Sequence, residues 1–240
     1  MTKPGLALDR TCGLTLLVAI VFLSGLGVAV AAAFSWHHED VSWIAAVSAL
    51  AAAAEASDFS IFPGSRVSIG MALVIAAGIF SGLPGAAVVS AVVAGVDFAA
   101  HRKAAKKAAF NCGTLLLSAA TFVGVIRVFE ASPDPGDWTA LLGPVVAGSV
   151  AAFAANSSLV AAAISLERGR AWWQTWREAF LWMLPHYVVL GTIALLAAAT
   201  YDRWEMWGLA LAIVPLAMAW LIMKQYAERV SGVSGPPRAA

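Results

Sequence analysis

The stretch His101-Arg102-Lys103-Ala104-Ala105-Lys106-Lys107 separates two long apolar segments and carries four of the fifteen Lys and Arg residues of the chain. The other basic residues also fall in every second connection between apolar segments, and only Arg127 and Arg203 lie in the alternate connections. Short cytoplasmic loops of membrane proteins retain Lys and Arg during insertion. The alternation therefore predicts a multi-pass protein of the cell membrane, with residues 101–107, residues 167–177 and both termini in the cytoplasm.

Eight apolar segments predict an all-α, polytopic transmembrane bundle of about eight spans. The 240 residues are 61% hydrophobic and 12% charged, whereas soluble domains contain about 25% charged residues. Because the connections are short, we expect one transmembrane domain over residues 1–230 and a disordered tail over residues 231–240. The segments are Leu14–Phe34, Val41–Ala56, Val67–Ser81, Pro84–Ala99, Ala109–Phe129, Trp138–Leu166, Met183–Thr200 and Trp207–Met223.

Two features leave alternatives to this count. Segments two to four are shorter than the roughly 20 residues that cross a hydrocarbon core, so they are either full crossings or a re-entrant pair. We expect full crossings, because the basic residues Arg10 and Arg102 require an even number of spans between them. The first segment imitates a cleavable signal peptide, but its apolar run of about 20 residues exceeds the usual length of about 7–15. We expect it to be retained as a span.

Gly and Pro residues mark the turns between these segments, since they end helices. Phe62-Pro63-Gly64 is expected to break the chain on the inner side, and Ser81-Gly82-Leu83-Pro84-Gly85 to form a tight outer hairpin. The ten Trp residues also fall near the segment ends, which fits interfacial anchors better than a cation-binding aromatic cage. Trp36, Trp43, Trp138, Trp204 and Trp207 are expected at outer ends, and Trp172, Trp173, Trp176, Trp182 and Trp220 at inner ends.

Residues 168–182 read as an amphipathic helix that lies in the inner membrane interface. Trp172, Trp173 and Trp176 recur at helical spacing on one face, while Arg170 and Arg177 occupy the other. This helix either orients the seventh span or acts as a lever toward the cytoplasm.

A second basic segment, residues 101–107, carries Arg102, Lys103, Lys106 and Lys107. Contact with anionic lipid is the favoured interpretation of this segment.

Polar residues inside the spans are the candidates for a ligand site, because each is costly in lipid. Asp97, Asn156 and His186 are the strongest candidates, and Asn111 and Tyr187 are the two further candidate ligand-binding residues. Asp97 and His101 are four residues apart and should pair on one helix. Together these side chains predict an inward-facing polar pocket. Interhelical hydrogen bonds that only hold the bundle together are an equally good interpretation.

Several functional classes are disfavoured by the sequence. There is no His-Glu-x-x-His, Gly-x-Ser-x-Gly or Walker motif, so we do not expect an enzyme. Neither Glu55 with Asp58 nor the four His residues form a convincing metal or haem site, and no cofactor is expected. Cys12 and Cys112 both face the reducing side, where disulfides are rare. No basic run is long enough to indicate nucleic acid.

Four short stretches resemble the N-terminal membrane-associated sensor (MASE-type) regions of bacterial cyclic-di-GMP signalling proteins. They are residues 62–73 (FPGSRVSIGMAL), 107–111 (KAAFN), 156–160 (NSSLV) and 176–187 (WREAFLWMLPHY). Such regions precede an HD-GYP phosphodiesterase or a GGDEF diguanylate cyclase domain. The sequence ends shortly after Gln225-Tyr226-Ala227-Glu228-Arg229, where the family has its signalling helix. The resemblance therefore implies a sensor of the bacterial inner membrane without its output domain.

Two function hypotheses follow. The first is a membrane sensor or regulatory module that signals to a separate cytoplasmic protein. The second is a small-molecule binding or transport subunit, similar to the substrate-capture component of vitamin transporters, which docks an ATPase-containing transporter through small residues on segments three and four. A structural membrane protein with no ligand is the third alternative. The lipid bilayer is the one partner common to all three, and the sequence leaves the oligomeric state open.

Overall fold

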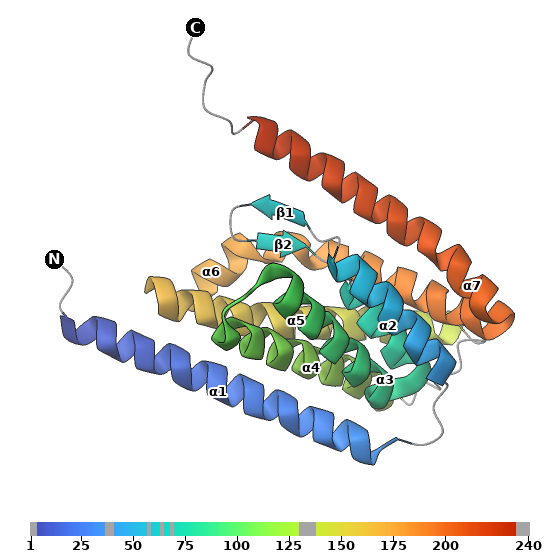
Figure 1. Cartoon of the computed structure of the whole chain (residues 1–240), viewed down its shortest axis with the longest axis horizontal. Coiled ribbons are helices and arrows are strands. Elements are labelled where there is room, and N and C mark those ends of the chain that lie inside the picture. Colours follow the sequence, from blue (N-terminus) through green and yellow to red (C-terminus); the bar gives the residue numbers. More distant parts are fainter. Residues whose placement is uncertain are drawn as a thin grey trace, which may run out of the picture.

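The structure is a computed structural model that describes residues 4–36, 41–56, 59–62, 65–67, 70–129 and 138–233. Asp58, His37, His38, the Pro63-Gly64 turn, the loop at 132–136 and residues 234–240 of the expected tail lie outside the described residues. Over the described range the chain is almost entirely helical (Figure 1). The expected helical class is therefore confirmed.

In the part of the chain that the structure describes, seven α-helices follow one another, with one short hairpin and one 3-10 turn between them. They are α1 (Pro4–Phe34), α2 (Val41–Ala56), α3 (Gly70–His101), α4 (Ala105–Val128), α5 (Trp138–Arg168), α6 (Trp172–Ala179) and α7 (Leu184–Val233), with strands β1 (Phe59–Phe62) and β2 (Ser65–Val67) and the 3-10 helix Leu181–Met183. Among the described residues, five helical stretches are long and apolar enough to cross a membrane: Thr11–Phe34, Gly70–His101, Ala105–Val128, Trp138–Arg168 and Trp172–Pro215.

The two longest of these stretches reverse direction internally. In α3 the reversal is at Gly82, whose φ of 59° is in the left-handed region that glycine adopts without strain. A Cβ added to Gly85 would lie 3.1 Å from the carbonyl oxygen of Ala77, eight residues earlier. In α7 the reversal is at Glu205, with φ 49° and ψ −130°. The hydroxyl of Thr200 donates to the carbonyl of Gly208 at 3.0 Å, although eight residues of straight helix span about 12 Å. Both helices are therefore helical hairpins, with limbs 70–81 and 83–101 in α3 and limbs 184–204 and 206–233 in α7.

A small antiparallel hairpin precedes α3, where helix had been expected to begin at Val67. β1 pairs with β2, with Phe59 opposite Val67, and α3 starts only at Gly70. The segment Phe59-Ser60-Ile61-Phe62 alternates aromatic or β-branched residues with a small one, which favours a strand. Strand pairing also satisfies backbone groups that lipid cannot hydrogen-bond. The expected start of the third helical segment at Val67 is thus wrong, while the helical class is unaffected.

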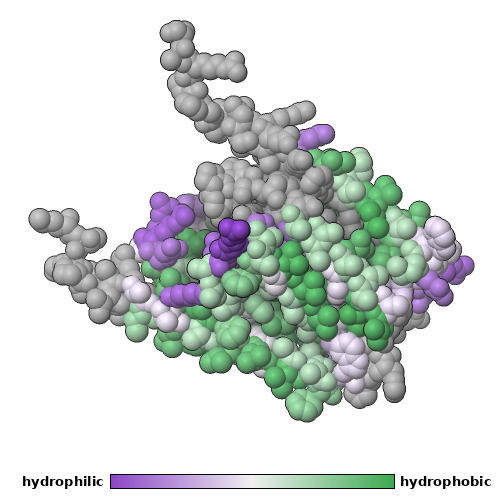
Figure 2. All heavy atoms as spheres, viewed as in Figure 1, coloured by the Kyte–Doolittle hydropathy of each residue, from purple (hydrophilic) through white to green (hydrophobic). Residues whose placement is uncertain are grey.

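The first limb of α3 is the centre of the core. Every residue from Gly70 to Ile79 is buried, and α2, α4 and α7 pack around α3. The helix α1, in contrast, lies along the outside of the bundle and is mostly exposed (Figure 1). On the face shown in Figure 2, hydrophobic residues cover much of the described surface, and hydrophilic residues gather mainly toward its two sides. This distribution is compatible with a membrane protein.

Glycines allow α1 and α4 to touch through their backbones. A Cβ added to Gly113 would lie 2.5 Å from the carbonyl oxygen of Val21, and one added to Gly25 would lie 2.7 Å from the Cα of Gly113. Gly148 meets the ring of Phe122 in a similar way at the α4–α5 contact, at 2.8 Å. Since lipid gives helices no hydrophobic reason to associate, such close packing is what holds the bundle together.

We expect Gly113→Ala to lower the free energy of unfolding by about 1–3 kcal/mol, because the new methyl group forces α1 and α4 apart. The matched control is Gly124→Ala on the same helix, where an added Cβ meets nothing within 4 Å. Better helix propensity should leave that variant unchanged or up to about 1 kcal/mol more stable. Unfolding in detergent measures both variants, and equal losses would contradict the backbone contact.

Candidate functional site

Asp97 is the centre of a polar network at the end of α3. Its carboxylate is buried and faces three partners from two helices and the turn between them. His101 Nδ1 lies 3.1 Å from Oδ1, Asn111 Nδ2 donates to Oδ2 at 3.1 Å, and the Lys103 ammonium contacts both oxygens. The expected pairing of Asp97 with His101 is confirmed, and Asn111, a candidate for the predicted pocket, contacts the same carboxylate.

The local sequence explains this geometry. Asp97 and His101 are one turn apart at the end of α3, so their side chains share a face. Arg102 leaves the helix with φ 46°, and the chain doubles back so that Lys103 meets Asp97 before α4 begins at Ala105. Asn111 reaches the same carboxylate from the second turn of α4. With three donors on one carboxylate, Asp97 closes the α3–α4 turn and is poorly placed to act as a general base.

A second polar network joins α5, α6 and α7. Asn156 Nδ2 donates to the Tyr187 hydroxyl at 3.1 Å. Trp176 Nε1 donates to the Ser157 hydroxyl at 2.9 Å, and the Phe153 ring packs edge-on against Tyr187 with the ring centroids 5.0 Å apart. These contacts hold the middle of α6 and the start of α7 against the same turn of α5.

His186 is adjacent to this second network but has no part in it. Its ring is half-buried, and its Nε2 atom is buried with no hydrogen-bond partner among the described residues. In the same part of the chain, no hydrogen bond joins the Asp97 network to Asn156 or Tyr187. The five candidate residues thus fall into two hydrogen-bonded groups, Asp97 with Asn111 and Asn156 with Tyr187, and one unpaired histidine.

The amphipathic helix is shorter than expected. α6 covers Trp172–Ala179 and is followed by a 3-10 turn at Leu181–Met183, whereas residues 168–182 had been expected as one helix. Trp176 stacks against both Trp172 and Trp173, with the Trp173 and Trp176 ring centroids 5.3 Å apart, while Trp172 and Trp173 are tilted relative to each other. Trp172 Nε1 donates to the Ser158 carbonyl at 3.1 Å. Arg170 precedes the helix, and Arg177 is exposed on it.

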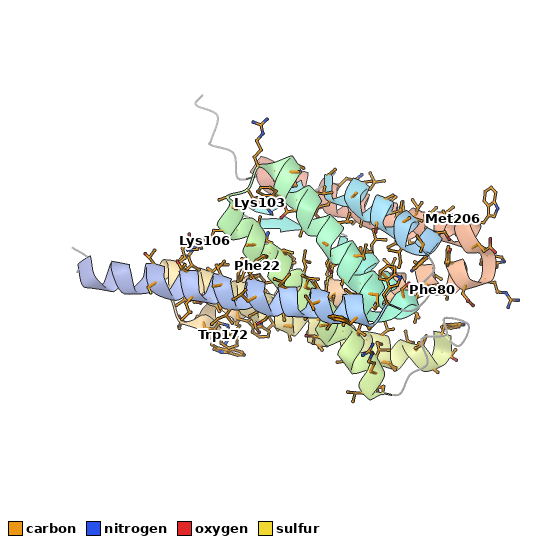
Figure 3. All side chains as sticks on the ribbon, turned by 60° about the horizontal axis from the view of Figure 1, so that its bottom comes forward. Phe22, Phe80, Lys103, Lys106, Trp172 and Met206 are labelled. Carbon is orange, nitrogen blue, oxygen red and sulfur yellow. The ribbon has the colours of Figure 1, made fainter. Side chains whose placement is uncertain are left out.

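Sequence reasoning missed the roles of Lys103 and Trp43. Lys103 had been assigned to lipid with its basic neighbours, but its ammonium is held by Asp97. Trp43 had been expected as an interfacial anchor, but it is fully buried. Its ring centroid lies 4.3 Å from that of Tyr201 and 5.1 Å from that of Phe80. Rings in direct contact leave no space for a ligand. The cluster instead pins α2, α3 and α7 together at the end opposite Lys103 (Figure 3).

Within the described part of the chain, no three side chains of the types that bind metals gather at one place. The polar groups on offer are a closed carboxylate network and a tyrosine–asparagine pair next to an unpaired histidine.

No family model matches the chain, and neither does any curated protein or solved structure.

We expect Lys103→Met to lower the free energy of unfolding by roughly 1–3 kcal/mol, because it leaves the buried Asp97 carboxylate without its strongest donor. Lys107→Met is the matched control, since Lys107 is exposed and outside the network. Adding Asp97→Asn to Lys103→Met should recover part of the loss, as coupled pairs are not additive. Chemical unfolding in detergent tests this, and independent effects of the two substitutions would show that the pair is not coupled.

Proposed function

We propose that the chain crosses the membrane eight times, with both termini in the cytoplasm. The reversals at Gly82 and Glu205 divide α3 and α7 into two limbs each, which supports eight helical passes in place of six. Successive passes then alternate in direction, and residues 101–107 and 167–177 fall at the same end of the bundle. That end carries most of the Lys and Arg residues.

We expect a cysteine at position 104 or 174 to be protected from an impermeant maleimide in intact cells and to react after lysis. A cysteine at Val128, which is 81% exposed at the opposite end, is the matched control and should react in intact cells. The background carries Cys12→Ser and Cys112→Ser. Labelling of position 104 or 174 before lysis would contradict the proposed topology, because it would place these residues outside the cytoplasm.

We propose further that the protein is a membrane sensor-like module that signals to a separate cytoplasmic partner. The observation that carries this proposal is the path of α7. Its first limb starts at the Asn156–Tyr187 pair, the helix reverses at Glu205, and the second limb diverges from the bundle (Figure 1). A ligand that changes the packing of Tyr187 against α5 would therefore act on the helix whose second limb diverges from the bundle.

The resemblance to MASE-type regions supports the same function. Its most specific stretch, residues 176–187, contains Trp176, His186 and Tyr187, which lie in or beside the second network. In this proposal Asn156, His186 and Tyr187 are the ligand-responsive residues. Asp97 and Asn111 hold the neighbouring turn, and no catalytic step or cofactor is involved.

We expect Asn156→Leu to change the distance between spin labels at positions 174 and 225, because it removes the hydrogen bond that fixes the start of α7. Both labelled positions are exposed, and the full chain is measured in vesicles by pulsed electron paramagnetic resonance. His186→Leu should shift the same distance. Thr192→Leu, on the exposed face of α7, is the control and should not. If Asn156→Leu also leaves the distance unchanged, the site is not coupled to the second limb of α7.

A substrate-capture subunit is the second candidate, and the structure restricts how it would dock. The small residues on the first limb of α3 are buried inside the bundle, so they are closed to a partner. On the second limb Ala91 and Gly95 are exposed, and an added Cβ at Gly95 meets nothing within 4 Å. A neighbouring gene for an HD-GYP or GGDEF protein would favour the sensor, while a pair of transporter ATPases would favour this alternative.

A further inference from the structure

One end of the bundle carries exposed cations that the Asp97 network does not use. They are Arg102, Lys106, Lys107, Arg168, Arg170 and Arg177, which we call the cationic rim. Only two exposed carboxylates, Glu167 and Glu178, accompany them among the described side chains. At the opposite end the described charges balance, with Arg127 and Arg203 against Asp202 and Glu205.

The cations of the rim are not neutralised within the described part of the protein. The ion pairs seen there are those of Asp97 with His101 and Lys103, and none includes a rim residue. Lys106 donates to the hydroxyl of Thr15 at 2.8 Å, which holds its ammonium at the boundary between α1 and α4. On the other side of α1, Gly13 approaches Leu166 near the end of α5. The rim therefore runs across the ends of several helices.

Exposed tryptophans border the rim at the same end. Trp172 is 43% exposed and Trp173 is 55% exposed, and the hydrogen bond of Trp172 to Ser158 fixes its indole plane. Lys103, Lys106 and Trp172 lie together at this end, far from Phe80 and Met206 (Figure 3). Tryptophan prefers the headgroup layer of a bilayer. The aromatic residues thus place the rim at the depth of the lipid phosphates, directly beside the apolar surface.

We propose that the cationic rim binds the headgroups of anionic phospholipids in the adjacent leaflet. Unpaired cations beside exposed hydrophobic side chains fit a molecule that has both a phosphate and acyl chains, whereas a soluble anion would use only the cations. Each exposed Lys or Arg near an anionic surface should strengthen binding about fivefold. This inference goes beyond the proposed sensing function and does not depend on the site at Asn156.

The test compares lipids added to the full-length protein in a neutral detergent. Phosphatidylglycerol, phosphatidylcholine and inorganic phosphate are titrated separately, with bound lipid counted by native mass spectrometry and stability followed by thermal unfolding. Arg102→Gln with Lys107→Gln is the main variant, because neither side chain makes a hydrogen bond or an ion pair within the described part of the protein. Arg127→Gln with Arg203→Gln removes the same charge at the opposite end and is the matched control.

We expect phosphatidylglycerol to bind and stabilise the protein at lower concentration than phosphatidylcholine. The main variant should weaken that preference by on the order of tenfold or more, and adding Lys106→Gln should weaken it further. The control variant should keep the preference of the unaltered chain. The proposal is overturned if the main variant keeps its preference, if both variants lose it equally, or if inorganic phosphate stabilises the protein as well as the anionic lipid does.

Discussion

The bundle depends on a central helical limb that completes its proposed pass of the membrane only together with the β1–β2 hairpin before it. The first limb of α3 has twelve residues and is about 18 Å long, whereas the hydrocarbon core is about 30 Å thick. Its residues from Gly70 to Ile79 are all buried, so its surroundings are protein and not lipid. The β1–β2 hairpin precedes it and contacts α7. Non-helical backbone is tolerated at membrane depth only where protein or water covers it, and this arrangement supplies that cover.

The sequence predicted the helical segments well because its strongest signals are long apolar runs and the charges between them. The reversal at Gly82 lies inside the expected Ser81–Gly85 turn, and the reversal at Glu205 lies between the seventh and eighth expected segments. The β hairpin was missed because its strands have four and three residues, too few for a periodic pattern to separate strand from helix end. The burial of Trp43 was missed for a related reason, since position near a helix end does not reveal which face is buried.

The candidate site was predicted in part. Asp97 with His101 follows from helical spacing alone, which one sequence supplies. The division of Asp97 and Asn156 between two hydrogen-bonded groups was not predicted, because it depends on how α3 and α5 are placed against each other. Lys103 was missed because a basic residue between spans normally faces headgroups, and only the tight turn after His101 returns it to Asp97. Local spacing thus explains the Asp97–His101 pair, whereas the errors arose where helix placement or a tight turn decides the contact.

The two networks differ in how completely their polar groups are satisfied, and this difference bears on where a response can begin. The Asp97 carboxylate has three donors, so any ligand there would have to displace existing contacts. Near Tyr187 the situation is reversed, because His186 Nε2 is buried and lacks a partner among the described residues. A buried polar atom without a hydrogen bond costs about 1–3 kcal/mol. In the proposed sensor, a ligand that supplies this bond would gain that free energy at the start of α7, while the Asp97 network would hold α3 and α4 together as the fixed part of the bundle.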